Sequence, residues 1–226
     1  AELFIELFSE EIPAKLQIDV RKKIKQILEE NLKKRGINFK LSKSFSTPKI
    51  LVFVVDGIPE KIKQKGKVLK GPKVGSPEVA LLGFIKSNNL NKSDVYKEKI
   101  EKGEFYFAET KTKTIDILEE LKSIIPETLK AYSWKKSMKW STYDLYWGRP
   151  LKSILAIFNK KVIDFNFFHL KSGNLTSLEE DDDKKVKKIS NFQYYLNLLK
   201  SQNIVLDQEK RKSLILKKMN SICNAR

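Results

Sequence analysis

The chain has 226 residues, enough for one large domain or two small ones, and its composition of 41% hydrophobic and 32% charged residues is that of a folded globular protein. Lysine and arginine outnumber aspartate and glutamate by 45 to 28, and the resulting net charge of +17 favours a polyanionic partner such as nucleic acid. Only five of the basic residues are arginine, the residue best suited to bidentate phosphate contacts, which weakens that indication.

Several classes of site are disfavoured by the residues present. A single cysteine, Cys223, excludes an intramolecular disulfide or a multi-cysteine zinc site, and a single histidine, His169, argues against a histidine metal site or relay. The chain has no nucleotide-binding loop of the Rossmann or P-loop type. No apolar run approaches the roughly 18–20 residues that span a bilayer, and no secretory signal is visible. We expect a cytoplasmic chain with no membrane partner, no metal site and no catalytic residues of its own.

The beginning of the chain predicts an α+β fold. Apolar residues at helical spacing indicate a helix from Leu16 to Arg35, which Gly36 ends. Glu6 alternates with apolar neighbours in the first strand and is expected on its exposed face, with Leu3, Ile5 and Leu7 buried on the other. Strands are predicted at residues 2–8, 39–45 and 50–55. This order indicates mixed or antiparallel sheets with packed helices, not a doubly wound repeat.

The rest of the chain is expected to end in a helical segment. The predicted elements are a polar connection at 58–76, a helix capped by Ser76 and starting at Pro77, a hairpin of strands 95–100 and 105–109, a helix at 114–125 that extends through 132, strands within 143–158 and 162–168, a short strand at 204–206, and helices at 191–201 and 207–223. A run of acidic and then basic residues suggests a linker. We therefore divide the chain into an α+β region at 1–176, a linker at 177–189 and a mainly helical segment at 190–226.

A basic, glycine-containing segment, residues 70–75, is the first candidate for nucleic-acid binding. Lys70 and Lys73 precede the predicted helix at Pro77, whose N-terminus favours phosphate. The alternative, which the sequence favours, is a solvated loop that caps the helix.

An aromatic segment, residues 132–149, is the second candidate. It holds all three tryptophans and three tyrosines, interleaved with the cations Lys135, Lys136, Lys139 and Arg149. Such rings stack on unpaired bases while the cations bind phosphates. The alternatives are that the rings anchor a core, which the sequence favours, or that they form a subunit interface.

Several short motifs, in order along residues 1–176, resemble the β subunit of the bacterial heterotetrameric glycyl-tRNA synthetase. The segments that carry the resemblance are 7–14 (LFSEEIPA), 47–51 (TPKIL), 70–72 (KGP), 102–106 (KGEFY), 137–140 (SMKW), 147–151 (WGRPL) and 172–176 (SGNLT). Asp207 and Arg211 fit a further motif of the same family. One departure is that the family continues after its G-N-x-T motif into G-H-R-F, whereas this chain continues into Leu178, Glu179 and Glu180.

The resemblance implies an N-terminal fragment of a longer subunit that lacks later domains, including an anticodon-binding region. It implies an α2β2 enzyme in which a separate α subunit binds glycine and ATP with Mg²⁺, while the β subunit contributes recognition of tRNA(Gly) and is required for the transfer step. The fragment alone is expected to be inactive. The alternative is a pure assembly module that binds protein and never contacts RNA.

Overall fold

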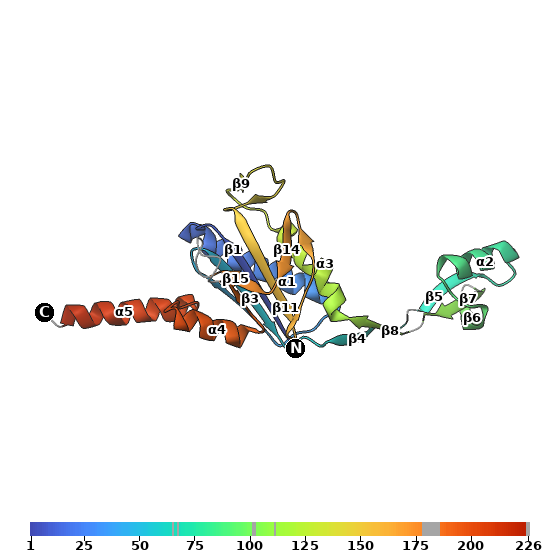
Figure 1. The fold of residues 1–226 in the computed structure, drawn as a ribbon. Coiled ribbons are helices and arrows are strands. Elements are labelled where there is room, and N and C mark those ends of the chain that lie inside the picture. Colours follow the sequence, from blue (N-terminus) through green and yellow to red (C-terminus); the bar gives the residue numbers. More distant parts are fainter. Residues whose placement is uncertain (65, 67, 101–102, 111, 178–185, 225–226) are drawn as a thin grey trace. The chain divides into compact units, whose positions relative to one another are not determined.

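The computed structural model describes residues 1–64, 66, 68–100, 103–110, 112–177 and 186–224 (Figure 1). The chain forms two compact units. Unit 1 comprises residues 1–60 together with 116–226, and unit 2 is the inserted segment 61–115. The fold is α+β with mixed and antiparallel sheets, as the sequence predicts.

A seven-stranded sheet forms the centre of unit 1, in the order β13-β14-β11-β1-β3-β2, with β12 paired to β11. The first strand, β1, lies between β11 and β3 and is antiparallel to both. The pairing of β11 with β14 is parallel, which makes the sheet mixed. The bounds of the seven strands are β1 (Glu2–Ser9), β2 (Leu41–Ser46), β3 (Ile50–Asp56), β11 (Leu151–Phe158), β12 (Lys161–Val162), β13 (Asn166–Phe167) and β14 (Leu170–Gly173).

Both faces of this sheet are covered. Leu3, Ile5 and Leu7 are buried on one face, as predicted, but Phe4 and Glu6 on the other face are buried as well, with no exposed side-chain area. The expectation that Glu6 faces solvent is therefore wrong. Alternation within one strand predicts which residues share a face, but not whether a later segment of the chain covers the second face.

Two helices, α1 (Ala14–Lys34) and α3 (Ile117–Ala131), pack against each other in unit 1 (Figure 1). Arg35, directly after α1, donates to Glu120 and Glu127 of α3 over 2.7 and 2.8 Å. Gly36 follows with a φ of +70°, the left-handed conformation that ends helices at glycine. Helix α3 continues through Pro126 without interruption.

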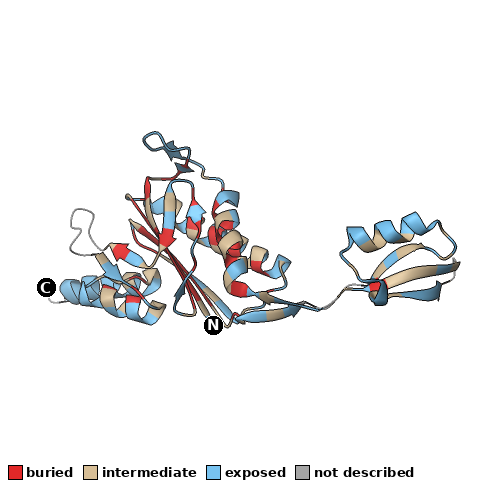
Figure 2. Cartoon of the chain, turned by 45° about the vertical axis from the view of Figure 1, so that its right-hand side comes forward, coloured by how far each residue is buried: buried red, intermediate tan, exposed pale blue. Residues whose placement is uncertain are grey.

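Helix α4 (Phe192–Ser201) covers the face of the sheet that carries Phe4, opposite to the face that carries Leu3, Ile5 and Leu7. Tyr195 and Leu199 of α4 join Phe4 and Phe8 of β1 in one apolar cluster, and Figure 2 shows buried residues along both the sheet and this helix. The start of α4 is held to β1 because the Phe192 amide donates to the Glu2 carboxylate over 3.0 Å. No strand forms at 204–206, where the sequence predicted one.

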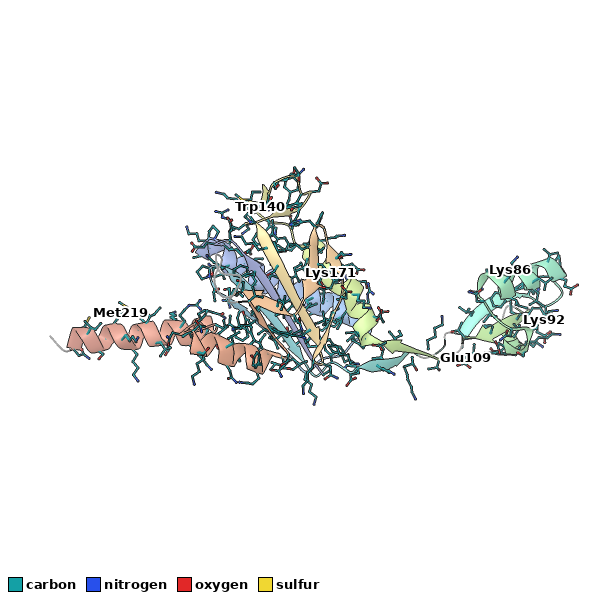
Figure 3. All side chains as sticks on the ribbon, viewed as in Figure 1. Lys86, Lys92, Glu109, Trp140, Lys171 and Met219 are labelled. Atoms are coloured by element: carbon teal, nitrogen blue, oxygen red, sulfur yellow. The ribbon has the colours of Figure 1, made fainter. Side chains whose placement is uncertain are left out.

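The last described helix, α5 (Gln208–Asn224), has no buried residue. Five apolar side chains of α5 are exposed: Leu214, Ile215, Leu216, Met219 and Ile222. Met219 projects from the helix in Figure 3. None of the helices in the described part of the chain has the length and apolar composition that a bilayer-spanning segment requires.

The residues proposed as a linker, 177–189, begin and end in regular structure. The strand β15 (Leu175–Ser177) pairs antiparallel with β16 (Val186–Lys188), and Ile189 is buried in the cluster with α4. The residues between these strands, 178–185, which include the departure from the family's G-H-R-F motif, lie outside the described residues.

Unit 2 consists of a three-stranded antiparallel sheet, a helix and a separate strand pair. The sheet has the order β5-β7-β6, and β4 pairs with β8. The expected polar connection at 58–76 therefore holds two strands, β4 and β5, and the helix begins after Pro77 without a side-chain cap from Ser76. The elements are β4 (Lys61–Gln64), β5 (Val68–Lys73), α2 (Glu78–Ser87), η1 (Lys92–Asp94), β6 (Val95–Ile100), β7 (Gly103–Glu109) and β8 (Lys113–Asp116).

Candidate nucleic-acid interface

The six cations that the sequence singles out fall in both units. Lys70 and Lys73 belong to unit 2, whereas Lys135, Lys136, Lys139 and Arg149 belong to unit 1.

Lys70 and Lys73 lie on strand β5 and not in a loop. The Lys70 ammonium lies 3.7 Å from the centre of the Phe105 ring, a cation–π contact within unit 2. A Cβ on Gly71 would lie 2.9 Å from the Phe84 ring, so this glycine allows α2 to approach β5 closely. The glycine is thus explained by packing, and Lys73 remains exposed.

The aromatic segment divides into packed and exposed rings. Trp134 lies edge-on to both Tyr132 and Trp147, with ring centroids 5.1 and 4.9 Å apart, and Trp147 in turn contacts Phe167 at 5.9 Å. These contacts agree with the core interpretation. In contrast, three rings are at least 39% exposed, and Trp140 projects from the loop that carries β9 (Met138–Lys139) in Figure 3. The exposed rings are Trp140, Tyr143 and Tyr146.

The four cations of the aromatic segment differ in their surroundings. Lys139 donates to Asp144 over 2.8 Å, and this pair holds the pKa of Asp144 below its ordinary value. Lys135 lies 3.9 Å from Asp19 of α1, a weaker contact, and Lys136 is exposed. Arg149 donates to the Gly148 carbonyl over 2.9 Å.

Arg149 also lines an open pocket with Glu10, Glu11 and Lys49. The formal charges of these four side chains cancel, so this pocket does not concentrate positive charge. The single histidine, His169, stacks on Tyr143 with ring centroids 3.6 Å apart. Among the described residues, no group of acidic, cysteine or histidine side chains is arranged to hold a metal ion.

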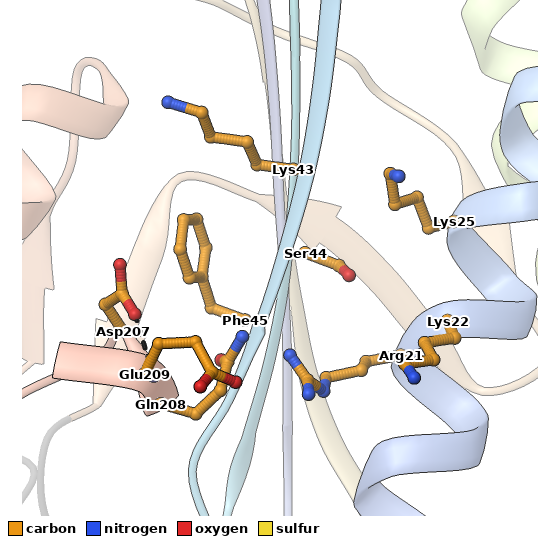
Figure 4. Close-up of a pocket in the computed structure, with 9 residues that line it drawn as sticks. All are labelled: Arg21, Lys22, Lys25, Lys43, Ser44, Phe45, Asp207, Gln208 and Glu209. Atoms are coloured by element: carbon orange, nitrogen blue, oxygen red, sulfur yellow. Dashed lines mark hydrogen bonds between the residues drawn. The ribbon is translucent and has the colours of Figure 1, made fainter. Parts of the chain in front are cut away.

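A more concentrated positive site lies where α1 approaches β2, the strand at the edge of the sheet (Figure 4). We call it the basic pocket. Arg21 points from α1 toward β2. The Ser44 side chain leaves β2 on the side of α1, and the Lys43 side chain leaves β2 on the other side. The pocket has a volume of about 420 Å³ and is lined by Arg21, Lys22, Lys25, Lys43, Ser44, Phe45, Asp207, Gln208 and Glu209.

The basic pocket is held in place by contacts between β2 and the start of α5. Arg211 donates to the carbonyls of Val205 and Ser46 over 2.7 and 3.1 Å, which fixes the first turn of α5 beside the end of β2. Asp207 accepts from the Glu209 and Lys210 amides, so its carboxylate caps the helix.

The cations of the pocket are only partly neutralised. Lys25 pairs with Glu29 one turn further along α1, at 3.3 Å, whereas the buried Nε of Arg21 has no hydrogen-bond partner among the described residues. On its outer side an edge strand also has backbone N–H groups that donate to no neighbouring strand. Cations beside such an edge can bind the phosphates of a polyanion.

None of the residues that line the basic pocket is among the site residues predicted from the sequence. The sequence does contain a signal for part of this pocket, because Lys22 and Lys25 are among the lysines opposite the apolar stripe of the first helix. What the sequence did not indicate is that β2 would be an edge strand and would place Lys43 near them.

Comparisons with known proteins agree with the family that the short motifs along residues 1–176 resemble. The family model described as glycyl-tRNA synthetase beta subunit matches residues 3–226. Proteins named glycine–tRNA ligase beta subunit from Rickettsia typhi and Rickettsia canadensis are 35% and 33% identical over 225 residues. These alignments cover 100% of this chain but 34% of each relative, so the chain spans about a third of their length. The chain belongs to the glycyl-tRNA synthetase beta-subunit family.

Proposed function

We propose that this chain is the N-terminal part of the β subunit of a cytoplasmic glycine–tRNA ligase, and that it binds the backbone of tRNA(Gly). In this proposal the enzyme is an α2β2 heterotetramer whose α subunit binds glycine and ATP with Mg²⁺. The present chain takes no part in glycine activation.

The observation that carries the RNA part of this proposal is the gathering of Arg21, Lys22, Lys25 and Lys43 at the basic pocket. Two carboxylates, Asp207 and Glu209, line the same pocket, which leaves a formal surplus of two positive charges. The net charge of +17 for the whole chain adds a long-range attraction for a polyanion.

A salt titration tests this role in the enzyme assembled from its α and β subunits. We expect Arg21→Ala, Lys22→Ala and Lys43→Ala each to weaken tRNA(Gly) binding at low salt. For each phosphate that a variant no longer neutralises, the slope of log affinity against log salt should become shallower by about 0.7–0.9. Lys200→Ala, which removes an exposed lysine of α4 outside the pocket, is the matched control.

Unchanged slopes in all three variants would contradict the RNA role. The cations would then serve only to keep the edge strand β2 from pairing with another chain. For the six cations selected from the sequence, contact with tRNA stays a prediction until slopes are measured for each.

The second candidate function is an assembly module without RNA contact, and α5 favours it. Five apolar side chains of α5 are exposed to solvent, and groups of exposed apolar side chains are typical of protein interfaces. Loss of association with the α subunit in Leu216→Lys or Met219→Lys, together with unchanged tRNA slopes in the pocket variants, would support this function instead.

A separate experiment tests the proposal that the α subunit, and not this chain, activates glycine. Purified chain without the α subunit should not catalyse glycine-dependent exchange of pyrophosphate into ATP, and addition of the α subunit should restore exchange. Exchange by the chain alone would show that it holds an activation site.

A further inference from the structure

A second pocket in unit 1 shares no lining residue with the basic pocket, and more than half of its lining residues are aromatic. We call it the aromatic pocket. It has a volume of about 270 Å³. Five of its nine lining residues are aromatic: Tyr132, Tyr146, Trp147, Phe167 and Phe168. The others are Leu129, Lys130, Asp144 and Leu145.

The rings of the aromatic pocket combine a rigid base with an open rim. Trp147 and Phe167 are 3% and 1% exposed and contact each other edge-on, so their positions are fixed by packing. Tyr146 and Phe168 are 62% and 49% exposed, although aromatic side chains of this size are usually covered. The pocket therefore offers exposed ring surface supported by buried rings.

One polar group among the lining residues has no partner. The indole Nε1–H of Trp147 is buried and has no acceptor among the described residues, and a buried donor left without an acceptor is costly. Because this atom is buried, the exposed rings, and not the indole N–H, are the surface that a ligand can contact.

A cation lies at the rim of the aromatic pocket. The Lys130 ammonium lies 5.7 Å from the centre of the Phe168 ring, at the rim. Asp144, the one acidic lining residue, is paired with Lys139. Lys136, on the same segment, is exposed.

We propose that the aromatic pocket binds an unpaired nucleobase of the RNA, which stacks on Tyr146 or Phe168 while Lys130 contacts the adjoining phosphate. Stacking on aromatic side chains is how proteins hold splayed-out bases, and every base has both a flat face and in-plane acceptors. This inference rests on the proposed function, because it names a second contact with the same RNA. It differs from the basic pocket in reading the base and not the backbone.

The experiment compares two single-stranded RNA oligonucleotides of equal length in the assembled enzyme. One carries bases, and the other is abasic, with the same phosphates but no bases. We expect wild type to bind the base-containing strand more tightly. Tyr146→Ala or Phe168→Ala, whichever removes the stacked ring, should reduce that preference by about 5- to 150-fold, the range for one stacked base. Their salt slopes should stay unchanged, since neither variant removes a cation.

Matched variants separate the loss of the ring from other effects of the substitution. Tyr146→Phe keeps the ring and should retain the preference. Tyr194→Ala removes an equally exposed ring on α4, outside the pocket, and should change nothing. Thermal unfolding of each variant shows whether it is folded, and the rim variants should be, because their rings are half exposed.

Failure of this inference and of the proposed function can be told apart. If Arg21→Ala and Lys22→Ala shallow the salt slope but Tyr146→Ala and Phe168→Ala leave the base preference intact, the chain binds RNA and the pocket does not hold a base. If the rim variants instead weaken association with the α subunit, the pocket is a protein-docking surface and the inference is wrong.

Discussion

The hydroxyl of Thr176 donates to the carboxylate of Glu6, 2.7 Å from one oxygen and 2.9 Å from the other, and so joins β15 to the middle of β1. Both side chains are fully buried. Burial raises the pKa of Glu6 from 4.5 to about 7, and the hydroxyls of Tyr195 and Thr176 oppose this rise. The Tyr195 hydroxyl approaches the carboxylate without reaching normal hydrogen-bond geometry. The carboxyl group of Glu6 therefore lies where the sheet, β15 and α4 meet.

Glu6 should make the stability of unit 1 fall as the pH rises. Since its pKa is higher in the folded chain than in the unfolded one, the folded state holds the proton more tightly. The stabilisation is complete below about pH 4.5 and is lost as the pH rises through about 7. A pKa rise of this size corresponds to about 3 kcal/mol at most.

Glu6→Gln removes this titration and keeps an acceptor for Thr176. We expect the difference in unfolding free energy between Glu6→Gln and wild type to move in favour of the variant between pH 5 and pH 8, measured by urea denaturation. Glu11→Gln, at an exposed position of the same region, should show no such drift. A constant difference for Glu6→Gln across this range would contradict the burial argument.

Gly148 is required by the packing of Trp134. A Cβ at this position would overlap the Trp134 ring, which itself packs edge-on against Trp147. We expect Gly148→Ala to lower the unfolding free energy by about 1–3 kcal/mol, the usual cost of overpacking, and to change the near-UV circular dichroism of the tryptophans. Gly173→Ala is the control, because a Cβ there would meet no atom within 4 Å. Equal stability of the two variants would show that Trp134 moves aside without cost.

Arg35 joins α1 to α3 through the fork of its guanidinium. One nitrogen donates to Glu120 and Ser123, and the other donates to both oxygens of Glu127. Lysine keeps the charge but cannot make these parallel contacts, so Arg35→Lys should cost about 1 kcal/mol, a modest value because the side chain is one-third exposed. A double-mutant cycle with Glu127→Gln measures the pairing. A coupling energy of zero would mean that helix packing alone holds α1 to α3.

Much of the fold could be predicted because its signals are local. The apolar spacing of the helix at Leu16–Arg35, its glycine stop at Gly36 and the alternation in the first strand each lie within one element. The burial of Glu6 could not be predicted in this way. It depends on Thr176 and Tyr195, which lie 170 and 189 residues further along the chain.

The candidate sites show the same limit. Rings and cations at residues 132–149 were recognised as a group, but only the tertiary structure separates the buried Trp147 from the exposed Tyr146 beside it. Gly71 lies in a segment for which the sequence leaves open a phosphate-binding loop or, as it favours, a solvated loop, whereas in the structure Gly71 lies on β5 and accommodates Phe84 of α2. The basic pocket joins Arg21 and Lys43 through sheet order, which residue spacing does not encode.

The ion pair between Lys139 and Asp144 bears on whether Lys139 contacts RNA. Its two atoms are 2.8 Å apart, and both side chains lie at the surface. While it is paired, the ammonium has its charge offset locally. Asp144→Asn should free it, strengthen tRNA(Gly) binding at low salt by a few fold, and steepen the salt slope by up to about 0.9.

Two further variants decide the role of that lysine. Lys139→Ala should have little effect in the wild-type background but should abolish the gain in the Asp144→Asn background. Asp164→Asn breaks a similar exposed pair with Lys171, at 3.4 Å, and serves as the control for a general change in net charge. If both asparagine variants strengthen binding equally, the gain reflects net charge alone, and Lys139 does not contact the RNA.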